Sequence, residues 1–412
     1  MDPDGETTTP DRRIVIEAGG IVAVEPDGSE PVAAGELDAS GCFAVPGLID
    51  CHVHLTAASA DEWALTGMSP SFVALDAAAE ARRMLARGFT TVRDMGGADW
   101  GLALAVESGL LEGPRVLFCG HALSATGGHG DLRPRGRSRI DPPELTPGIG
   151  LVTDGEDALR GAVRNEFRRG ASHIKLMVSG GVSSPADAID TLQYSDDEIR
   201  AAVNEAARVG AYVAAHAYTA TAIERAVRLG VRSIEHGNLL DEAAAEAMAT
   251  QGAHLVPTLV TYAVLEEEGP ASGLPPTSVA KVAAVRERGE ESLAVAARAE
   301  VPMAYGSDLL GGMRLHQSEE FRIRARTQTS WEVLRGATTN AARLLGHPGV
   351  LGVVAPGAVA DLILTDANPG HDVTVLADPD RSVSAVIAGG RMLVDRASRP
   401  PVQTSTLPGR AE

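Results

Sequence analysis

Two histidines at alternate positions mark the part of the chain best suited to chemistry. The segment Val45–Leu55 reads VPGLIDCHVHL and places His52 and His54 two residues apart, after a mostly apolar run. In a β-strand, residues two apart point to the same face, so both imidazoles would leave one strand end side by side. Such a pair can hold one metal ion. Alone, it is equally compatible with chance surface histidines.

Further polar residues accompany other apolar runs in the same way. Four apolar runs end in, or are followed by, one such residue: Asp94 (TTVRD), His216 (AYVAAH), His236 (SIEH) and Asp308 (VPMAYGSD). A fifth run, HIKLM, contains Lys175. Each has a structural explanation by itself, as a core histidine, a helix cap or a lysine that extends from a strand end. Their common placement predicts one cluster at one mouth of the sheet, formed by His52, His54, Lys175, His216, His236 and Asp308. Four histidines and a carboxylate suit two metal ions, if a further group bridges them.

The composition excludes several classes of protein. The chain has 412 residues, 44% hydrophobic and 3% aromatic, and a formal net charge of −19. Such an acidic chain is a poor binder of nucleic acid. Three cysteines without a CxxC pair argue against a disulfide framework and fit a reducing compartment. No signal peptide or membrane-length apolar run is visible, so we expect a cytoplasmic protein that binds neither nucleic acid nor membranes.

The order of the predicted elements favours an α/β fold. From Pro46, short apolar strands alternate with amphipathic helices, several of which end at a glycine suited to a left-handed cap. Eight strands are predicted, at 48–54, 90–95, 116–119, 173–178, 211–216, 233–236, 254–256 and 301–306. This repetition indicates a parallel sheet, and eight units fit a closed (β/α)8 TIM barrel. A doubly wound open sheet is the alternative, but no GxGxxG follows a strand.

The two ends of the chain have a different pattern. Arg13–Val24 reads as a β-hairpin, and residues 352–395 return to strands and turns. We therefore expect a disordered lead-in over residues 1–10, a small β-sandwich domain built from residues 11–45 and 348–400, and a barrel over residues 46–347 inserted into it. Two long loops, 120–150 and 262–279, are expected to border the active site.

These segments together carry a family resemblance. The combination of PGLIDCHVHL, TTVRDMGG, HIKLMVSGG, AAHAY, IEHG and GSD resembles the metal-dependent amidohydrolase superfamily. More narrowly, the chain is similar to the imidazolonepropionase-like group that contains Xaa-Pro dipeptidases (prolidases), aryl- and arginine-dipeptidases, and ochratoxin-type amidases. The resemblance runs from Ile14 to about Val394. It implies a (β/α)8 barrel with a small β-sandwich.

The resemblance also implies two divalent ions, usually zinc. The protein ligands would be four histidines, a carboxylate and a lysine: His52, His54, His216, His236, Asp308 and Lys175. The first two histidines and the carboxylate would hold one ion, and the other two histidines the second. The lysine would be carbamylated by CO2 and bridge both ions. Its ammonium form cannot bind a cation, but its charge is disfavoured near two metals, which leaves a neutral amine able to react.

The implied reaction is hydrolysis of an amide C–N bond by metal-activated hydroxide, because two ions lower the pKa of a shared water from ~15.7 towards ~7. Asp308 would transfer the proton to the leaving nitrogen. Tyr218 and His129 are the candidates to stabilise the tetrahedral oxyanion and to bind the substrate. Arg93 is a third candidate for substrate binding, with a structural ion pair to Asp94 as the alternative.

A small-molecule amide is therefore the expected substrate. A dipeptide in a prolidase-like reaction, or an N-acyl amino acid, comes first; a xenobiotic amide, carbamate or urea, or a cyclic amide such as an imidazolone, would suit the same site. The alternative of a different class is a non-catalytic barrel scaffold that has lost its metal. Relatives have an additional strand pair before the segment matching Arg13–Val24. Its absence implies either a reduced β-domain or a sheet edge that a second subunit covers, and we expect a homo-oligomer.

Overall fold

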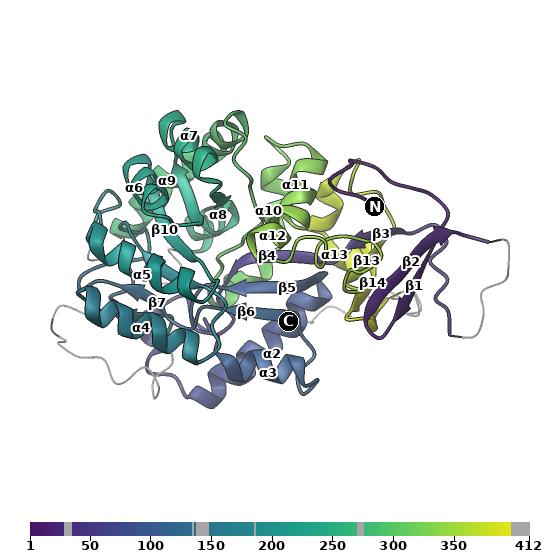
Figure 1. Cartoon of the computed structure of the whole chain (residues 1–412), viewed down its shortest axis with the longest axis horizontal. Helices are drawn as coiled ribbons and strands as arrows, with labels where there is room; N and C mark the ends of the chain where they lie inside the picture. The colour runs from purple at the N-terminus through teal and green to yellow at the C-terminus, as the bar shows by residue number, and fades with distance from the viewer. Residues whose placement is uncertain (29–34, 134–135, 137–147, 185–186, 270–275, 397–412) are drawn as a thin grey trace, which may run out of the picture.

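The structure is a computed structural model that describes residues 1–28, 35–133, 136, 148–184, 187–269 and 276–396. Two sheets of parallel strands form the centre of its larger part (Figure 1). The three-stranded sheet contains β4 (Leu48–Val53), β5 (Phe89–Asp94) and β6 (Arg115–Phe118). The six-stranded sheet has the order β12-β11-β10-β9-β7-β8: β7 (Ala122–Ser124), β8 (Gly150–Val152), β9 (Ile174–Met177), β10 (Val213–Thr219), β11 (Ser233–Leu239) and β12 (His254–Val256).

Backbone hydrogen bonds join the two sheets along both edges. On one side, the Ser172 amide donates to the Phe118 carbonyl at 2.9 Å, between β9 and β6. On the other, Met303 forms a parallel bridge to Leu255, and the Cys51 amide donates to the Tyr305 carbonyl at 2.8 Å. The segment 301–306 thus occupies the place of the eighth predicted strand, but it makes only this isolated bridge. Pro302 lacks the amide proton that a regular ladder would need.

Helices connect the parallel strands. Between β4 and β9 the chain forms α1 (Glu62–Leu65), α2 (Pro70–Ala86), α3 (Trp100–Glu107) and α4 (Glu156–Arg168). The second half contains α5 (Asp196–Arg208), α6 (Ala220–Arg228), α7 (Glu242–Gln251), α8 (Leu259–Glu268) and α9 (Pro276–Arg298). After these come the 3-10 helix η1 (Gly311–His316), α10 (Glu319–Arg324), α11 (Ser330–Gly336) and α12 (Thr339–Leu344). None of the helices in the described residues has the length and apolar character to cross a membrane.

Local sequence sets the start of α5, where Ser195 and Glu198 form a capping box. The predicted loop 262–279 is wrong over most of its length, since α8 runs to Glu268 and α9 begins at Pro276. Residues 270–275 of that loop lie outside the described residues, as do residues 134–135 and 137–147 of the other predicted loop, 120–150.

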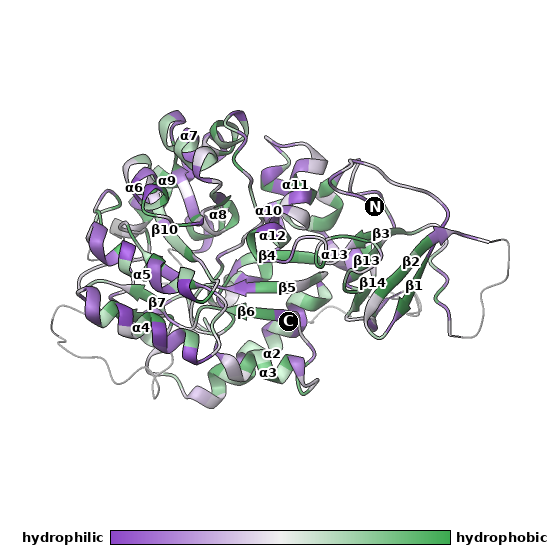
Figure 2. Ribbon diagram, viewed as in Figure 1, coloured by the Kyte–Doolittle hydropathy of each residue, from purple (hydrophilic) through white to green (hydrophobic). Residues whose placement is uncertain are grey.

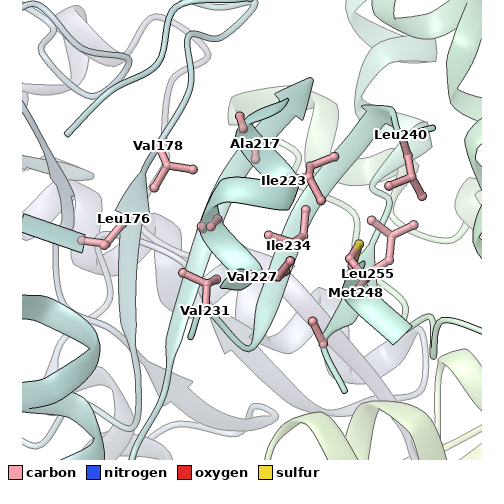
Figure 3. Packing of buried hydrophobic residues seen from close by; sticks show 14 of the residues in the cluster. Leu176, Val178, Ala217, Ile223, Val227, Val231, Ile234, Leu240, Met248 and Leu255 are labelled. Atoms are coloured by element: carbon pink, nitrogen blue, oxygen red, sulfur yellow. The ribbon is translucent and has the colours of Figure 1, made fainter. Parts of the chain in front are cut away.

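The core follows from the apolar strands and the inner faces of the helices. Figure 2 shows hydrophobic residues concentrated on the central strands, and Figure 3 shows Ile223 and Val227 of α6 close to Ile234 of β11. Ile223 and Val227 of α6 pack with Ile234 and Leu255 in one buried cluster. Much of this cluster is alanine and valine, as expected for a chain with 3% aromatic residues. This packing holds the ends of the parallel strands in fixed positions.

A second, smaller β-structure is built from both ends of the chain. The hairpin of β1 (Arg12–Glu17) and β2 (Gly20–Pro26) is antiparallel, as predicted. A four-stranded sheet has the order β15-β14-β13-β3: β3 (Phe43–Pro46), β13 (Leu362–Thr365), β14 (Val383–Ala388) and β15 (Arg391–Asp395). Between α12 and β15 also lie the 3-10 helix η2 (Val373–Ala377) and α13 (Pro379–Ser382). The sandwich arrangement and the domain boundaries stay predictions.

Residues 1–10 differ from the expected disordered lead-in. The amino group of Met1 donates to the Ala44 carbonyl at 2.8 Å. Asp4 forms an ion pair with Arg343, and Glu6 forms one with Arg335 at 2.6 Å. The polar, threonine-rich composition suggested disorder, but these acidic side chains have basic partners on α11 and α12.

Candidate active site

The predicted site residues converge on one cavity. It has a volume of about 360 Å³ and lies at the carboxyl ends of the parallel strands. All predicted site residues except Arg93 line it: His52, His54, His129, Lys175, His216, Tyr218, His236 and Asp308. They come from β4, β9, β10, β11 and three loops, so the folded chain brings together groups that are distant in sequence.

His52, His54 and Asp308 form the tightest group of possible metal ligands. The Nε2 atoms of both histidines lie 3.2 Å from Asp308 Oδ1, and the ligand atoms of the three residues lie within 4.8 Å of one another. The Nδ1 atom of His54 donates to the Gly96 carbonyl at 2.9 Å, and that of His52 bonds to Glu235 at 2.8 Å. With each Nδ1 atom bonded elsewhere, both Nε2 atoms and Asp308 Oδ1 converge on one point. Two imidazole nitrogens and a carboxylate oxygen are ordinary ligands of a divalent metal, so this donor set fits one.

His216 and His236 extend the cluster. Their ring centroids are 4.6 Å apart, and the His236 centroid is 5.1 Å from that of His52. His216 Nε2 donates to the Gly180 carbonyl at 3.1 Å, and His236 Nδ1 lies 2.8 Å from the Thr258 hydroxyl. Burial lowers the pKa of both rings well below its ordinary value, so both are neutral at pH 7. One nitrogen of each ring stays available as a ligand.

Lys175 lies inside this cluster with 1% of its surface exposed. Burial lowers the pKa of its amine to about 8, which leaves a larger neutral fraction at pH 7 than an exposed lysine has. No hydrogen bond or ion pair joins its Nζ atom to any other residue in the described part of the chain. A buried lysine without a counterion is costly, and this position therefore fits a lysine that carries a modification or a bridging role.

Two ligand candidates have a left-handed backbone. His236 has φ 75° and Asp308 has φ 52°, conformations that cost non-glycine residues about 1–3 kcal/mol. Gly306 permits the close approach of this segment to β4, because a Cβ atom there would lie 2.4 Å from Val256 and 3.0 Å from His52. The Asp308 amide in turn donates to the His52 carbonyl at 2.8 Å. The surrounding contacts thus hold Asp308 against the two histidines.

Arg93 corrects the sequence-based assignment. It is fully buried and does not line the cavity, so it cannot contact a substrate there. Its partner is Glu235, at 2.8 Å, and not Asp94. Asp94 instead accepts hydrogen bonds from the backbone amides of Leu55, Gly96 and Ala98. Arg93 and Asp94 are adjacent on β5 and point to opposite faces, which prevents their pairing.

Glu235 is a site residue that the sequence did not single out as functional. Its carboxylate bonds to His52 Nδ1 at 2.8 Å and to Arg93, so it fixes which nitrogen of His52 faces Asp308. Burial acts to raise the pKa of Glu235, but Arg93 and His52 hold it below its usual value. The available signal was a carboxylate inside the apolar run SIEH, since a buried carboxylate must find a partner.

Replacing Glu235 by Gln is expected to lower metal affinity about 10- to 100-fold. The glutamine amide carries no negative charge, so it holds the His52 ring in its orientation less strongly than the carboxylate does. Competition with a fluorescent chelator measures the change. Glu166→Gln is the matched control, because Glu166 is a buried carboxylate bonded to His121 at 2.8 Å and neither residue lines the cavity. Equal losses of metal affinity in the two variants would contradict this role.

Tyr218 and His129 occupy another wall of the cavity. The Tyr262 hydroxyl donates to the Tyr218 hydroxyl at 3.0 Å, which leaves the Tyr218 proton free for another acceptor. His129 Nδ1 lies 3.0 Å from the Ser184 hydroxyl, which donates its own proton to Asp187. Ser184 must then accept from His129, and the neutral ring presents a lone pair at Nε2. Burial lowers the pKa of His129 to about 4, so Tyr218 is the better oxyanion donor.

Comparison with known proteins places the chain in a family. The sequence profile of the amidohydrolase family matches residues 43–393. Ochratoxinase from Aspergillus niger is 32% identical over 365 residues, which cover 84% of this chain and 75% of that protein. Among solved structures, a prolidase complexed with N-methylphosphonate-L-proline is 49% identical, with a TM-score of 0.90 over 93% of this chain and 94% of that one. A Xaa-Pro dipeptidase with bound methionine is 28% identical, with a TM-score of 0.83 over 95% and 97% of the two chains. The chain therefore belongs to the amidohydrolase family, and it is a hydrolase that acts on carbon–nitrogen bonds.

Proposed function

We propose that this protein is a binuclear metal-dependent amidohydrolase that cleaves a dipeptide in a prolidase-like reaction. The observation that carries the proposal is the group of buried acceptors around Asp308, with both histidine Nε2 atoms 3.2 Å from its Oδ1 atom. Buried acceptors this close together are unfavourable by themselves, and a bound cation would remove that cost. The 49% identity to a prolidase complexed with a phosphonate analogue that contains proline supports the choice of substrate.

The proposed fold is a closed (β/α)8 barrel inserted into a small β-sandwich. Support comes from the hydrogen bonds that join the two parallel sheets along both edges and from the pairing of β3 with β13, which brings the two chain ends into one sheet. A cytoplasmic location, a homo-oligomeric state and the absence of a nucleic-acid partner belong to the same proposal.

Six residues would hold the two ions, which we propose to be zinc: His52, His54, His216, His236, Asp308 and a carbamylated Lys175. Two divalent ions at this position would supply a hydroxide nucleophile at neutral pH and polarise the scissile carbonyl. Addition of CO2 to the neutral Lys175 amine would form the carbamate N–C bond and release one proton. The resulting anion would offset the charge of the ions and give the cluster two further oxygen ligands.

The chain's own residues would carry the remaining steps. Asp308 would hold the proton released at the nucleophile and deliver it to the leaving nitrogen. The Tyr218 hydroxyl would donate to the oxyanion of the tetrahedral intermediate. His129, with its Nε2 lone pair, would accept a hydrogen bond from the substrate. The apolar lining of the cavity, which includes Leu310 and Met313, would exclude water from the reacting groups.

A substrate panel with the zinc-loaded protein tests the function. Xaa-Pro dipeptides are expected to give the highest kcat/KM, ahead of dipeptides without proline and N-acyl amino acids. The similarity to ochratoxinase makes a xenobiotic amide the second candidate, and the panel should include ochratoxin A. A purified protein that neither carries nor takes up zinc, manganese or cobalt, and that hydrolyses none of these compounds, would be the scaffold instead.

Tyr218→Phe is expected to lower kcat about 10²- to 10³-fold with little change in KM, because the hydroxyl acts only as charge develops on the oxyanion. Steady-state kinetics with the best dipeptide measures both constants. Tyr194→Phe is the matched control, since the Tyr194 hydroxyl is buried without a partner in the described structure and does not line the cavity. An equal effect of both changes would exclude Tyr218 as the oxyanion donor.

A further inference from the structure

The cavity contains a carboxylate that neither the ligand set nor the proposed reaction uses. Glu62 begins the short helix α1 and lines the cavity, where its side chain is half-buried. Among the residues that the structure describes, its one hydrogen-bond partner is the Ser183 hydroxyl, which donates to Glu62 Oε1 at 3.4 Å. No basic side chain forms an ion pair with it in that part of the chain. This charge is therefore available to something that enters the cavity.

The other carboxylates that line the cavity are already occupied. Asp61 Oδ1 accepts from the Ala64 amide at 3.0 Å and so caps α1. Asp131 forms an ion pair with Arg133 at 2.6 Å. Asp308 faces the histidines. Burial raises the pKa of Glu62 to about 7, as expected for a carboxylate whose charge lacks a compensating partner. A cation beside it would remove this penalty.

Glu62 lines the same cavity as the proposed metal ligands His54 and Asp308. Ser183, whose hydroxyl donates to Glu62, lines this cavity as well. In a dipeptide with a free amino terminus, only the α-carbon separates the ammonium group from the scissile carbonyl carbon. When that carbonyl lies at the cluster, the ammonium group is therefore close to the same end of the cavity.

We propose that Glu62 binds the protonated α-amino group of the substrate and thereby selects dipeptides with a free amino terminus over N-acyl amino acids. The inference rests on the proposed function and decides between two of its substrate classes. An N-acyl compound would bring a neutral amide to this position and leave the carboxylate unpaired. Loss of a charge-assisted hydrogen bond of this kind corresponds to about a 10- to 100-fold loss in kcat/KM.

The test compares L-alanyl-L-proline with L-lactoyl-L-proline, which has a hydroxyl in place of the ammonium group and the same scissile bond. Wild-type protein loaded with zinc is expected to prefer the dipeptide about 10- to 100-fold in kcat/KM. Glu62→Gln should reduce this preference to about 1, mainly by raising KM for the dipeptide, whereas Glu62→Asp, which keeps the charge, should retain part of it. Asp61→Asn is the matched control, because it removes the neighbouring charge while asparagine still caps α1.

The possible outcomes separate the role of Glu62 from the assignment of the protein as a hydrolase. A wild-type protein without preference between the two compounds, or a Glu62→Gln variant with the wild-type preference, would overturn the role of Glu62 and leave the hydrolase assignment intact. Equal losses on both compounds in Glu62→Gln would also overturn it, because they would indicate a structural role. Failure of the zinc-loaded wild type to hydrolyse either compound, or any other member of the substrate panel, would instead refute the proposed function.

Discussion

Replacing Asp308 by Asn is expected to lower kcat about 10²- to 10⁴-fold while both metal ions stay bound. The carboxylate lies 3.2 Å from the Nε2 atoms of His52 and His54, and in the proposed reaction it takes up and releases the proton. The asparagine amide keeps an oxygen at this position and can still face an ion, but it cannot accept the proton. Steady-state kinetics with the best dipeptide, together with metal analysis of the same sample, measures the two effects separately.

The metal content is the internal control for this variant. If Asp308→Asn loses its metal, the lower activity would report a missing ligand. Asp308→Glu, which keeps a carboxylic acid, would then be the second variant that tests the proton-transfer role. Turnover within tenfold of the wild-type value, with both ions in place, would show that another group carries the proton.

Replacing Lys175 by Ala is expected to abolish activity and to remove metal, and a short carboxylic acid should restore part of both. The Lys175 side chain is 1% exposed, so its removal leaves a buried space beside the histidines. Its Nζ atom forms no close ion pair in the part of the chain that the structure describes. Formate, acetate or propionate could then provide the two oxygens that the proposed carbamate provides. Metal content and kcat are measured with and without each acid.

Lys281→Ala is the matched control for chemical rescue. Lys281 also lies beside the cavity, but its Nζ atom donates to the backbone carbonyls of Gly181, Ser184 and Asp187. Any activity lost in that variant should be insensitive to carboxylic acids, because no anion is missing there. Full activity of Lys175→Ala without an added acid would disprove the bridge.

Local patterns in the sequence were sufficient for most of the fold. Seven of the eight predicted parallel strands correspond to β4, β5, β6, β9, β10, β11 and β12. Alternation of apolar runs and amphipathic helices is encoded by neighbouring residues, and so is the capping of α5 by Ser195. The segment 301–306 and the ordered residues 1–10 depend instead on distant partners, such as Cys51 for the first and Arg335 for the second.

The site was predictable where its geometry follows from strand ends. Residues such as His216 and His236 had to converge once their strands were recognised as parallel neighbours. The strands β10 and β11 do pair in parallel, with His216 opposite Glu235 and His236 opposite Ala217. The roles of Glu235 and Arg93 were not predictable, because their hydrogen bonds connect strands far apart in sequence. Glu62 was missed for a related reason: its position in the cavity depends on the loop after β4, whose course no periodic pattern defines.

The division of the ligands between two sheets has a consequence for how the protein matures. Of the proposed ligands, His52 lies in the three-stranded sheet and His54 directly follows its strand β4, whereas His216 and His236 lie in the six-stranded sheet. Asp308 follows the segment that joins the two sheets. The full ligand set thus forms only after contacts between residues very distant in the chain, which are slow to form. Metal uptake would therefore come late in biogenesis, after synthesis of the segment that carries Asp308. A nascent chain could hold an ion only weakly, and tight binding would mark a molecule whose topology is complete.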